Sequence, residues 1–133
     1  MTPRVLVVDD SRTARELHRK VLEAAGYQVS VAQDAFEALI QLSQDGTIKL
    51  VVTDVEMGAM DVVMLTKAIR TRGGLPVVVV TSDEHDGLRE RALAAGADAY
   101  IVKRGLSWSL LVRTVERLLG GTGPVPDFTV AFS

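Results

Sequence analysis

The alternation of two kinds of segment along the chain constrains the fold most. Short apolar runs rich in β-branched residues occur at residues 5–8, 50–53, 77–80 and 99–102. Their apolar side chains are consecutive, which is typical of strands that are covered on both faces. Residues 27–32 instead alternate apolar and polar side chains, which indicates a strand nearer an edge of the sheet. We therefore predict five strands, four of them buried.

The longer segments between these runs have the periodicity of amphipathic helices. The predicted helices span residues 12–25, 35–44, the stretch between Asp61 and Gly73, about 87–95, and 107–119. Asp34 and Asp61 are candidate N-caps of the second and third helices. Phe36 is expected to face inward, and His18 to lie on the surface. The order βαβαβαβαβα predicts an α/β protein with a doubly wound parallel sheet and helices on both faces.

Length and composition exclude several classes of protein. The 133 residues suit one domain, and the absence of cysteine excludes disulfides and cysteine-based zinc sites. The net charge of −2 gives no attraction to nucleic acid. The apolar runs are too short for a signal peptide or a membrane span, so we expect a cytoplasmic protein. A local basic cluster is interpreted as a solvated helix face: Arg12, Arg15, Arg19 and Lys20.

Chemically complementary side chains follow four of the predicted strands. Asp9 and Asp10 follow the first strand, Asp54 the third, Thr81 the fourth and Lys103 the fifth. In open parallel sheets, ligands bind beyond the carboxyl ends of the strands, so these groups should meet at one edge. Carboxylates suit Mg²⁺, which would make a carboxylate nucleophile workable against a phosphate. Asp10 could alternatively serve only as a helix cap.

Several segments together resemble the receiver domains of bacterial two-component response regulators. The segments are VLVVDDS at 5–11, VTDVEM at 52–57, MD at 60–61, VTS at 80–82 and AAGADAYIVK at 94–103. The similarity runs in register from about residue 4 to residue 119. It implies a flavodoxin-like (βα)5 fold with strand order 2-1-3-4-5. Residues 1–120 would form the receiver domain, and residues 121–133 a flexible C-terminal tail.

The resemblance also implies a role for each site residue. Asp54 would be the phosphoacceptor, with Mg²⁺ as the cofactor. The metal would be held by Asp10, Asp54 and the backbone carbonyl of Glu56, with Asp9 acting through a bound water. Thr81 and Lys103 would bind the phosphoryl group, and Thr81 and Tyr100 would form the switch pair. Glu56 and Asp83 would tune the lifetime of the phosphoryl group.

Partners follow from the same resemblance. The expected partners are a histidine kinase and a downstream protein that binds the fourth helix, the fifth strand and the fifth helix; neither nucleic acid nor a membrane is expected. The chain would be a monomer or weak dimer that phosphorylates and dephosphorylates itself, but is not otherwise an enzyme. It would be either a chemotaxis-type single-domain regulator or a receiver module of a hybrid kinase.

The sequence departs from the family pattern at three positions. Gly58 stands where the family usually has proline, Val62 where it usually has glycine, and Arg104 where proline usually follows the lysine. None of these changes removes a reacting group. They affect the expected shapes of the loops that follow Asp54 and carry Lys103, and the Lys103–Arg104 peptide is predicted to be trans.

Two alternative functions remain open. One is a haloacid-dehalogenase-like phosphatase, which also uses a strand-end aspartate and Mg²⁺. Its signature places a second acid two residues after the first, where this chain has Ser11. The other is a phosphorylation-independent adaptor that uses the fold for docking only. A dinucleotide-binding domain is disfavoured because no glycine-rich turn follows the first strand. A flavodoxin is disfavoured because two acids there would repel a phosphate.

Overall fold

The computed structural model describes residues 3–54, 59–81, 87–102 and 108–120. Its sheet has five strands, and every neighbouring pair is parallel. The strands are β1 Arg4–Val8, β2 Gln28–Ala32, β3 Ile48–Asp54, β4 Val77–Thr81 and β5 Ala99–Val102. Their order across the sheet is β2-β1-β3-β4-β5. The predicted fold class and strand order are therefore confirmed.

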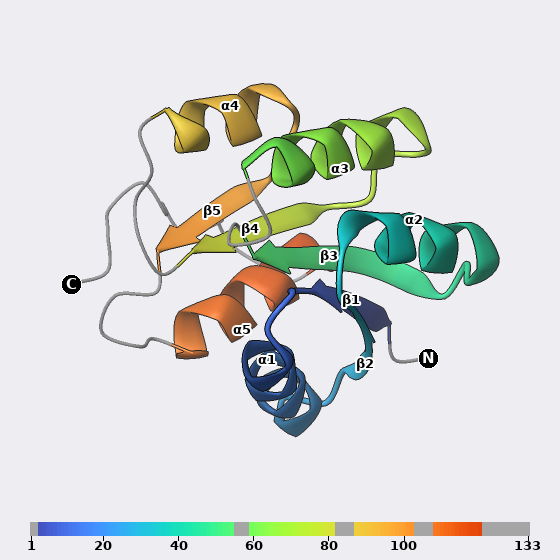
Figure 1. Ribbon diagram of the computed structural model, residues 1–133. Coiled ribbons are helices and arrows are strands. Elements are labelled where there is room, and N and C mark those ends of the chain that lie inside the picture. Colours follow the sequence, from blue (N-terminus) through green and yellow to red (C-terminus); the bar gives the residue numbers. More distant parts are fainter. Residues whose placement is uncertain (1–2, 55–58, 82–86, 103–107, 121–133) are drawn as a thin grey trace.

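Helices cover both faces of this sheet. They are α1 Arg12–Ala24, α2 Ala35–Gln44, α3 Ala59–Thr71, α4 Leu88–Ala94 and α5 Trp108–Leu118. Figure 1 shows α2, α3 and α4 on one face and α1 and α5 on the other. In the described part of the chain, no helix has the length and hydropathy of a transmembrane segment. The predicted flexible tail, residues 121–133, lies outside the described residues.

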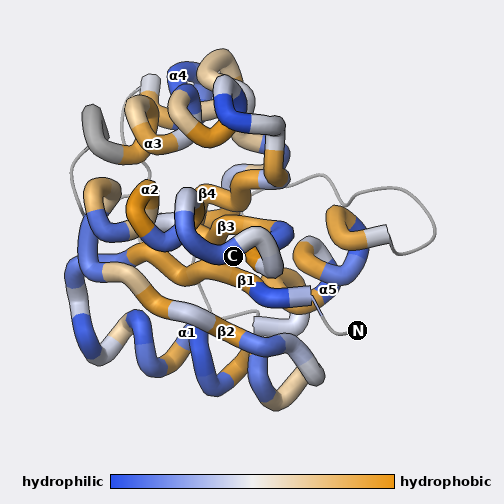
Figure 2. The backbone as a smooth tube through the Cα atoms, turned by 90° about the vertical axis from the view of Figure 1, so that its right-hand side faces the viewer, coloured by the Kyte–Doolittle hydropathy of each residue, from blue (hydrophilic) through white to orange (hydrophobic). Residues whose placement is uncertain are grey.

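Two apolar cores sandwich the sheet. One lies under α2, α3 and α4, where Val62, Leu65 and Leu88 pack on the sheet. The other lies under α1 and α5, where Leu22 and Val115 pack on its opposite face. Figure 2 shows the consequence, with largely apolar strands between helices along which hydrophilic and apolar residues alternate. This arrangement explains the consecutive apolar residues of the central strands, because both of their faces are buried.

The beginnings of the helices match the sequence only in part. Asp34 is the N-cap of α2, as predicted, and its side chain accepts a hydrogen bond of 2.8 Å from the Glu37 amide. The prediction that Asp61 caps α3 is wrong, because that helix already begins at Ala59. The earlier start places Val62, which replaces the usual family glycine, inside α3, where it is fully buried.

Two residues lie on the face opposite to the predicted one. Phe36 is 75% exposed, because the stripe of α2 that packs on the sheet is formed by Ala38 and Leu39 rather than by Phe36. His18, expected at the surface, is only 1% exposed. Its Nδ1 lies 2.8 Å from the Ala14 carbonyl oxygen, which offsets the cost of burying a polar ring.

Candidate functional site

Sheet register brings the predicted site residues of three strands to one edge. Asp54 is the last residue of the central strand β3 and pairs with Val80 of β4. Because Val8 of β1 pairs with Thr53, Asp9 lies level with Asp54 on the neighbouring strand. Thr81 ends β4 on the other side of Asp54. The structure therefore gathers the carboxylates of two adjacent strand ends and one hydroxyl at the carboxyl edge.

All three of these side chains are buried. Asp9 is 1% exposed, Asp54 3% and Thr81 0%. Strand residues alternate between the two faces of a sheet. Counted from the core residues Val7 and Val52, the side chains of Asp9 and Asp54 belong to the same face. Two buried carboxylates on one face of adjacent strands form a strongly acidic centre.

Asp9 is held by several hydrogen bonds. Its amide donates to the Ala32 carbonyl at the end of β2, over 3.0 Å. Its carboxylate Oδ1 accepts from the Ser11 amide at 2.9 Å. Ser11, and not Asp10, is the N-cap of α1, with its hydroxyl accepting from the Ala14 amide. The alternative hypothesis that Asp10 serves as the helix cap is therefore excluded. Asp10 is exposed, next to the buried Asp9.

Sequence reasoning missed one residue that contacts this site. The sequence pattern favours a solvated basic face for Arg15, but its Nη1 donates to the Asp9 carbonyl oxygen at 2.8 Å. Arg19, one turn further along α1, does lie at the surface and forms ion pairs with Glu16 and Glu23. No spacing rule distinguishes these two arginines, because both lie in the same amphipathic helix.

The donor set suits Mg²⁺ in its chemistry. Asp9, Asp10 and Asp54 offer hard carboxylate oxygens, and Mg²⁺ takes one or two carboxylates while keeping several waters. Within the described residues, no group of three or more acidic or imidazole side chains is assembled as a direct metal site. A metal held there would therefore need water or backbone ligands. The Glu56 carbonyl, the fourth predicted ligand, lies outside the described residues, as do Asp83, Lys103 and Arg104.

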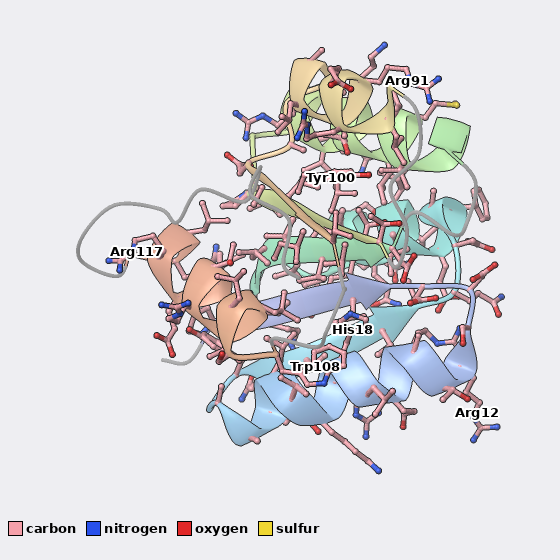
Figure 3. The ribbon with its side chains drawn as sticks, turned by 90° about the vertical axis from the view of Figure 1, so that its left-hand side faces the viewer. Arg12, His18, Arg91, Tyr100, Trp108 and Arg117 are labelled. Carbon is pink, nitrogen blue, oxygen red and sulfur yellow. The ribbon has the colours of Figure 1, made fainter. Side chains whose placement is uncertain are left out.

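Tyr100, the aromatic member of the predicted switch pair, lies in β5 and is 3% exposed. It pairs in the sheet with Val79 and belongs to the core on the α3 and α4 side. Figure 3 shows it between the sheet and those helices. Thr81 lies two residues beyond Val79, so by strand alternation its side chain belongs to the same face as Tyr100.

Comparison with known families agrees with this geometry. The family of the response regulator receiver domain matches residues 5–114. These residues contain both buried acids and all five strands, apart from Arg4 at the start of β1. The chain belongs to this family. The family of haloacid-dehalogenase-like phosphatases, left open by the sequence, is thereby set aside.

Curated relatives of this receiver domain are longer proteins. The chain is 38% identical over 125 residues to response regulator MprA of Mycobacterium avium, covering 93% of this chain and 54% of that protein. It is 36% identical over 118 residues to a gliding motility regulatory protein of Myxococcus xanthus, covering 86% of this chain and 15% of that protein. The receiver domain thus spans about half or less of these relatives.

Solved structures of receiver proteins have the same fold. The chemotaxis protein CheY4 of Vibrio cholerae matches with a TM-score of 0.79 and 27% identity, over 89% of this chain and 99% of that one. A response regulator of Thermotoga maritima matches with a TM-score of 0.79 and 29% identity, over 91% of this chain and 100% of that one.

Membership places the chain in a family of signalling domains. Receiver domains are generally not enzymes, and phosphorylation-dependent switching is the general function of the family. Response regulators act with histidine kinases, and receiver domains typically bind Mg²⁺ at the site of phosphorylation.

Proposed function

We propose that this receiver domain accepts a phosphoryl group from a histidine kinase on Asp54 and then signals through protein contacts. The observation that carries the proposal is the pair of buried carboxylates, Asp9 and Asp54, level with one another at the ends of β1 and β3. An acidic centre of this kind attracts a cation, and a carboxylate beside a cation can attack a phosphoryl group.

The transfer forms one bond and breaks another. A carboxylate oxygen of Asp54 attacks the phosphorus of the phosphohistidine and forms an acyl phosphate. The P–N bond breaks, and its electron pair remains on the imidazole nitrogen, which takes up a proton. Bound Mg²⁺, held by Asp10, Asp54 and the Glu56 carbonyl, would neutralise the charge of the phosphoryl oxygens. The Thr81 hydroxyl would donate a hydrogen bond to one of these oxygens, and Lys103 would supply a positive charge.

The proposed output surface comprises α4, β5 and α5. Thr81 and Tyr100 belong to the same face of the sheet. When the Thr81 hydroxyl moves toward the phosphoryl group, it would leave space beside it, and the Tyr100 ring would move into that space. On this surface, Leu93 of α4 is 40% exposed and Arg113 of α5 is exposed. Trp108, the first residue of α5, packs its indole against His18 of α1.

Beryllofluoride with Mg²⁺ tests the phosphoacceptor. We expect amide NMR shifts around Asp54 and Thr81 in the wild type, and none in Asp54→Asn. Asp34→Asn is the matched control, because Asp34 follows β2 at the same edge and an asparagine retains its capping oxygen. If beryllofluoride shifts no amide signals in the wild type, the result would favour the phosphorylation-independent adaptor instead.

A second variant pair tests the coupling to the output surface. Thr81→Val removes a buried hydroxyl while keeping the shape of the side chain. We expect it to retain beryllofluoride shifts near Asp54 and to lose those at Leu93 and Arg113. Thr53→Val is the control, because Thr53 is equally buried, 0% exposed, one residue before Asp54. Persistence of the Leu93 and Arg113 shifts in Thr81→Val would show that the signal takes another route.

A further inference from the structure

The backbone between the two acids of the first strand end is held by a side chain from α1. The Asp9 carbonyl oxygen accepts a hydrogen bond of 2.8 Å from Arg15 Nη1. The same residue is fixed through its amide, bonded to Ala32, and through its carboxylate, bonded to Ser11. Asp9 is therefore held on both sides of its Cα, and Arg15 supplies the bond on the Asp10 side.

The Asp9 carbonyl and the Asp10 amide belong to one planar peptide unit. A hydrogen bond that fixes the direction of this carbonyl therefore fixes the plane from which the Asp10 backbone continues. Asp10 itself is exposed. The orientation of the Asp10 backbone thus depends on its two neighbours, Asp9 and the helix cap Ser11.

We propose that Arg15 is a positioning residue for Asp10, and that it sets the affinity of the site for Mg²⁺. The inference rests on the proposed function, in which Asp10 is a metal ligand. Arg15 acts through the peptide plane and touches neither the metal nor the phosphoryl group. Its guanidinium is suited to this task, because its planar donors form directed hydrogen bonds and it stays charged at every relevant pH.

A purely electrostatic role for Arg15 predicts the opposite effect on metal binding. If its positive charge acted only by opposing the cation, removing the charge would tighten Mg²⁺ binding. If the hydrogen bond orients Asp10, removing it weakens Mg²⁺ binding, although one positive charge has gone. The direction of the change therefore distinguishes the two roles.

The test is a Mg²⁺ titration of the unphosphorylated protein, followed by amide NMR shifts. We expect Arg15→Met, which keeps the apolar stem, to weaken Mg²⁺ binding about tenfold or more, as is usual when a group that orients a metal ligand is lost. Arg15→Lys, which keeps a charged donor, should recover most of the affinity. Arg19→Met is the matched control, because Arg19 lies on the same helix and pairs only with Glu16 and Glu23 among the described residues.

Urea unfolding of each variant shows that it is folded, and Arg15→Gln replaces Arg15→Met if the latter is not. Equal or tighter Mg²⁺ binding by the Met or Gln variant would overturn the positioning role, as would an equal loss in Arg19→Met. Absence of Mg²⁺ binding in the wild type would overturn the proposed function as well. Normal wild-type binding with an unaffected Arg15 variant would overturn the positioning role alone.

Discussion

The imidazole of His18 lies edge-to-face against the indole of Trp108, with 5.2 Å between the ring centroids and 89° between the planes. The contact joins α1 to the first residue of α5, as Figure 3 shows. Such aromatic pairs contribute beyond the area that they bury. The two helices that cover one face of the sheet are thus joined between the middle of α1 and the start of α5.

We expect His18→Ala to lower the free energy of unfolding by about 2–4 kcal/mol, because it leaves a cavity and removes the ring contact. Leu17→Ala is the matched control, because Leu17 is the preceding residue of the same helix and is 48% exposed. This control should change stability by about 0.5 kcal/mol or less. Urea unfolding measures both. Similar losses in the two variants would contradict the buried position of His18.

A second prediction concerns Gly96, which has a φ of +111° and lies against the Arg70 side chain. An added Cβ would lie 2.7 Å from Arg70 Cγ, whereas a Cβ on Gly26, with a φ of +101°, meets no atom within 4 Å. We expect Gly96→Ala to be less stable than Gly26→Ala by roughly 1 kcal/mol or more, because both strain the backbone and only one forces Arg70 to move. Chemical denaturation compares them.

The double variant Gly96→Ala with Arg70→Ala checks the cause. It should remove the extra loss, once the cost of Arg70→Ala alone has been subtracted. That single variant breaks the 3.5 Å ion pair with Asp98, so it must be measured separately. If the two single losses simply add, the Arg70 side chain is not the source of the difference.

A third prediction concerns the acid stability of the protein. The Thr47 hydroxyl, and then the Thr47 amide, donate to the Asp45 carboxylate and lower the pKa of this group in the folded state. The unfolded value is about 3.9. A lowered folded pKa contributes stability above the unfolded pKa, and this stability is lost as pH falls through the folded pKa.

Thr47→Val should therefore lose stability relative to wild type at pH 6, and the gap should narrow below about pH 4, near the unfolded pKa of aspartate. The effect should be small, because Asp45 is at the surface and well solvated. Thr47→Ser keeps the hydroxyl and should follow the wild-type profile. Unfolding free energies of the three proteins from pH 2 to 7 provide the test. A difference between Thr47→Val and wild type that does not change with pH would show that the Thr47 hydroxyl does not lower the pKa of Asp45.

A fourth prediction concerns the acidic centre without metal. Asp9 and Asp54 are both buried and level with one another, so their charges oppose folding once the strands are paired. Asp54→Asn should raise the melting temperature in EDTA. Mg²⁺ at 100 times its dissociation constant should stabilise the wild type by about 2.7 kcal/mol, and Asp54→Asn by much less.

Thermal melts of wild type, Asp54→Asn and the control Asp34→Asn, each with EDTA and with Mg²⁺, measure this effect. The control should respond to Mg²⁺ as the wild type does, because Asp34 caps α2 and is exposed. A wild type that melts at the same temperature in both buffers would contradict the acidic metal site. A less stable Asp54→Asn in EDTA would contradict the repulsion.

The fold class and the edge at which the site forms follow from the amino-acid sequence alone. Apolar runs such as residues 77–80 can be buried on both faces only in a sheet covered by helices, and the helical crossovers between successive strands make such a sheet parallel. All its carboxyl ends then lie at one edge, so the position of Asp54 immediately after an apolar run already places it there. These features follow from local patterns, which a sequence displays directly.

Which residues each helix buries, and which polar groups meet, depend on how the elements pack together. Periodicity gives α1 and α2 an apolar side, but the elements packed against each helix decide which stripe is covered. His18 is buried because Trp108 of α5 lies against it, and Phe36 is exposed because Ala38 and Leu39 form the stripe of α2 that packs on the sheet. The bond from Arg15 to Asp9 likewise depends on the turn between β1 and α1. Such contacts join residues across elements, so no local pattern encodes them.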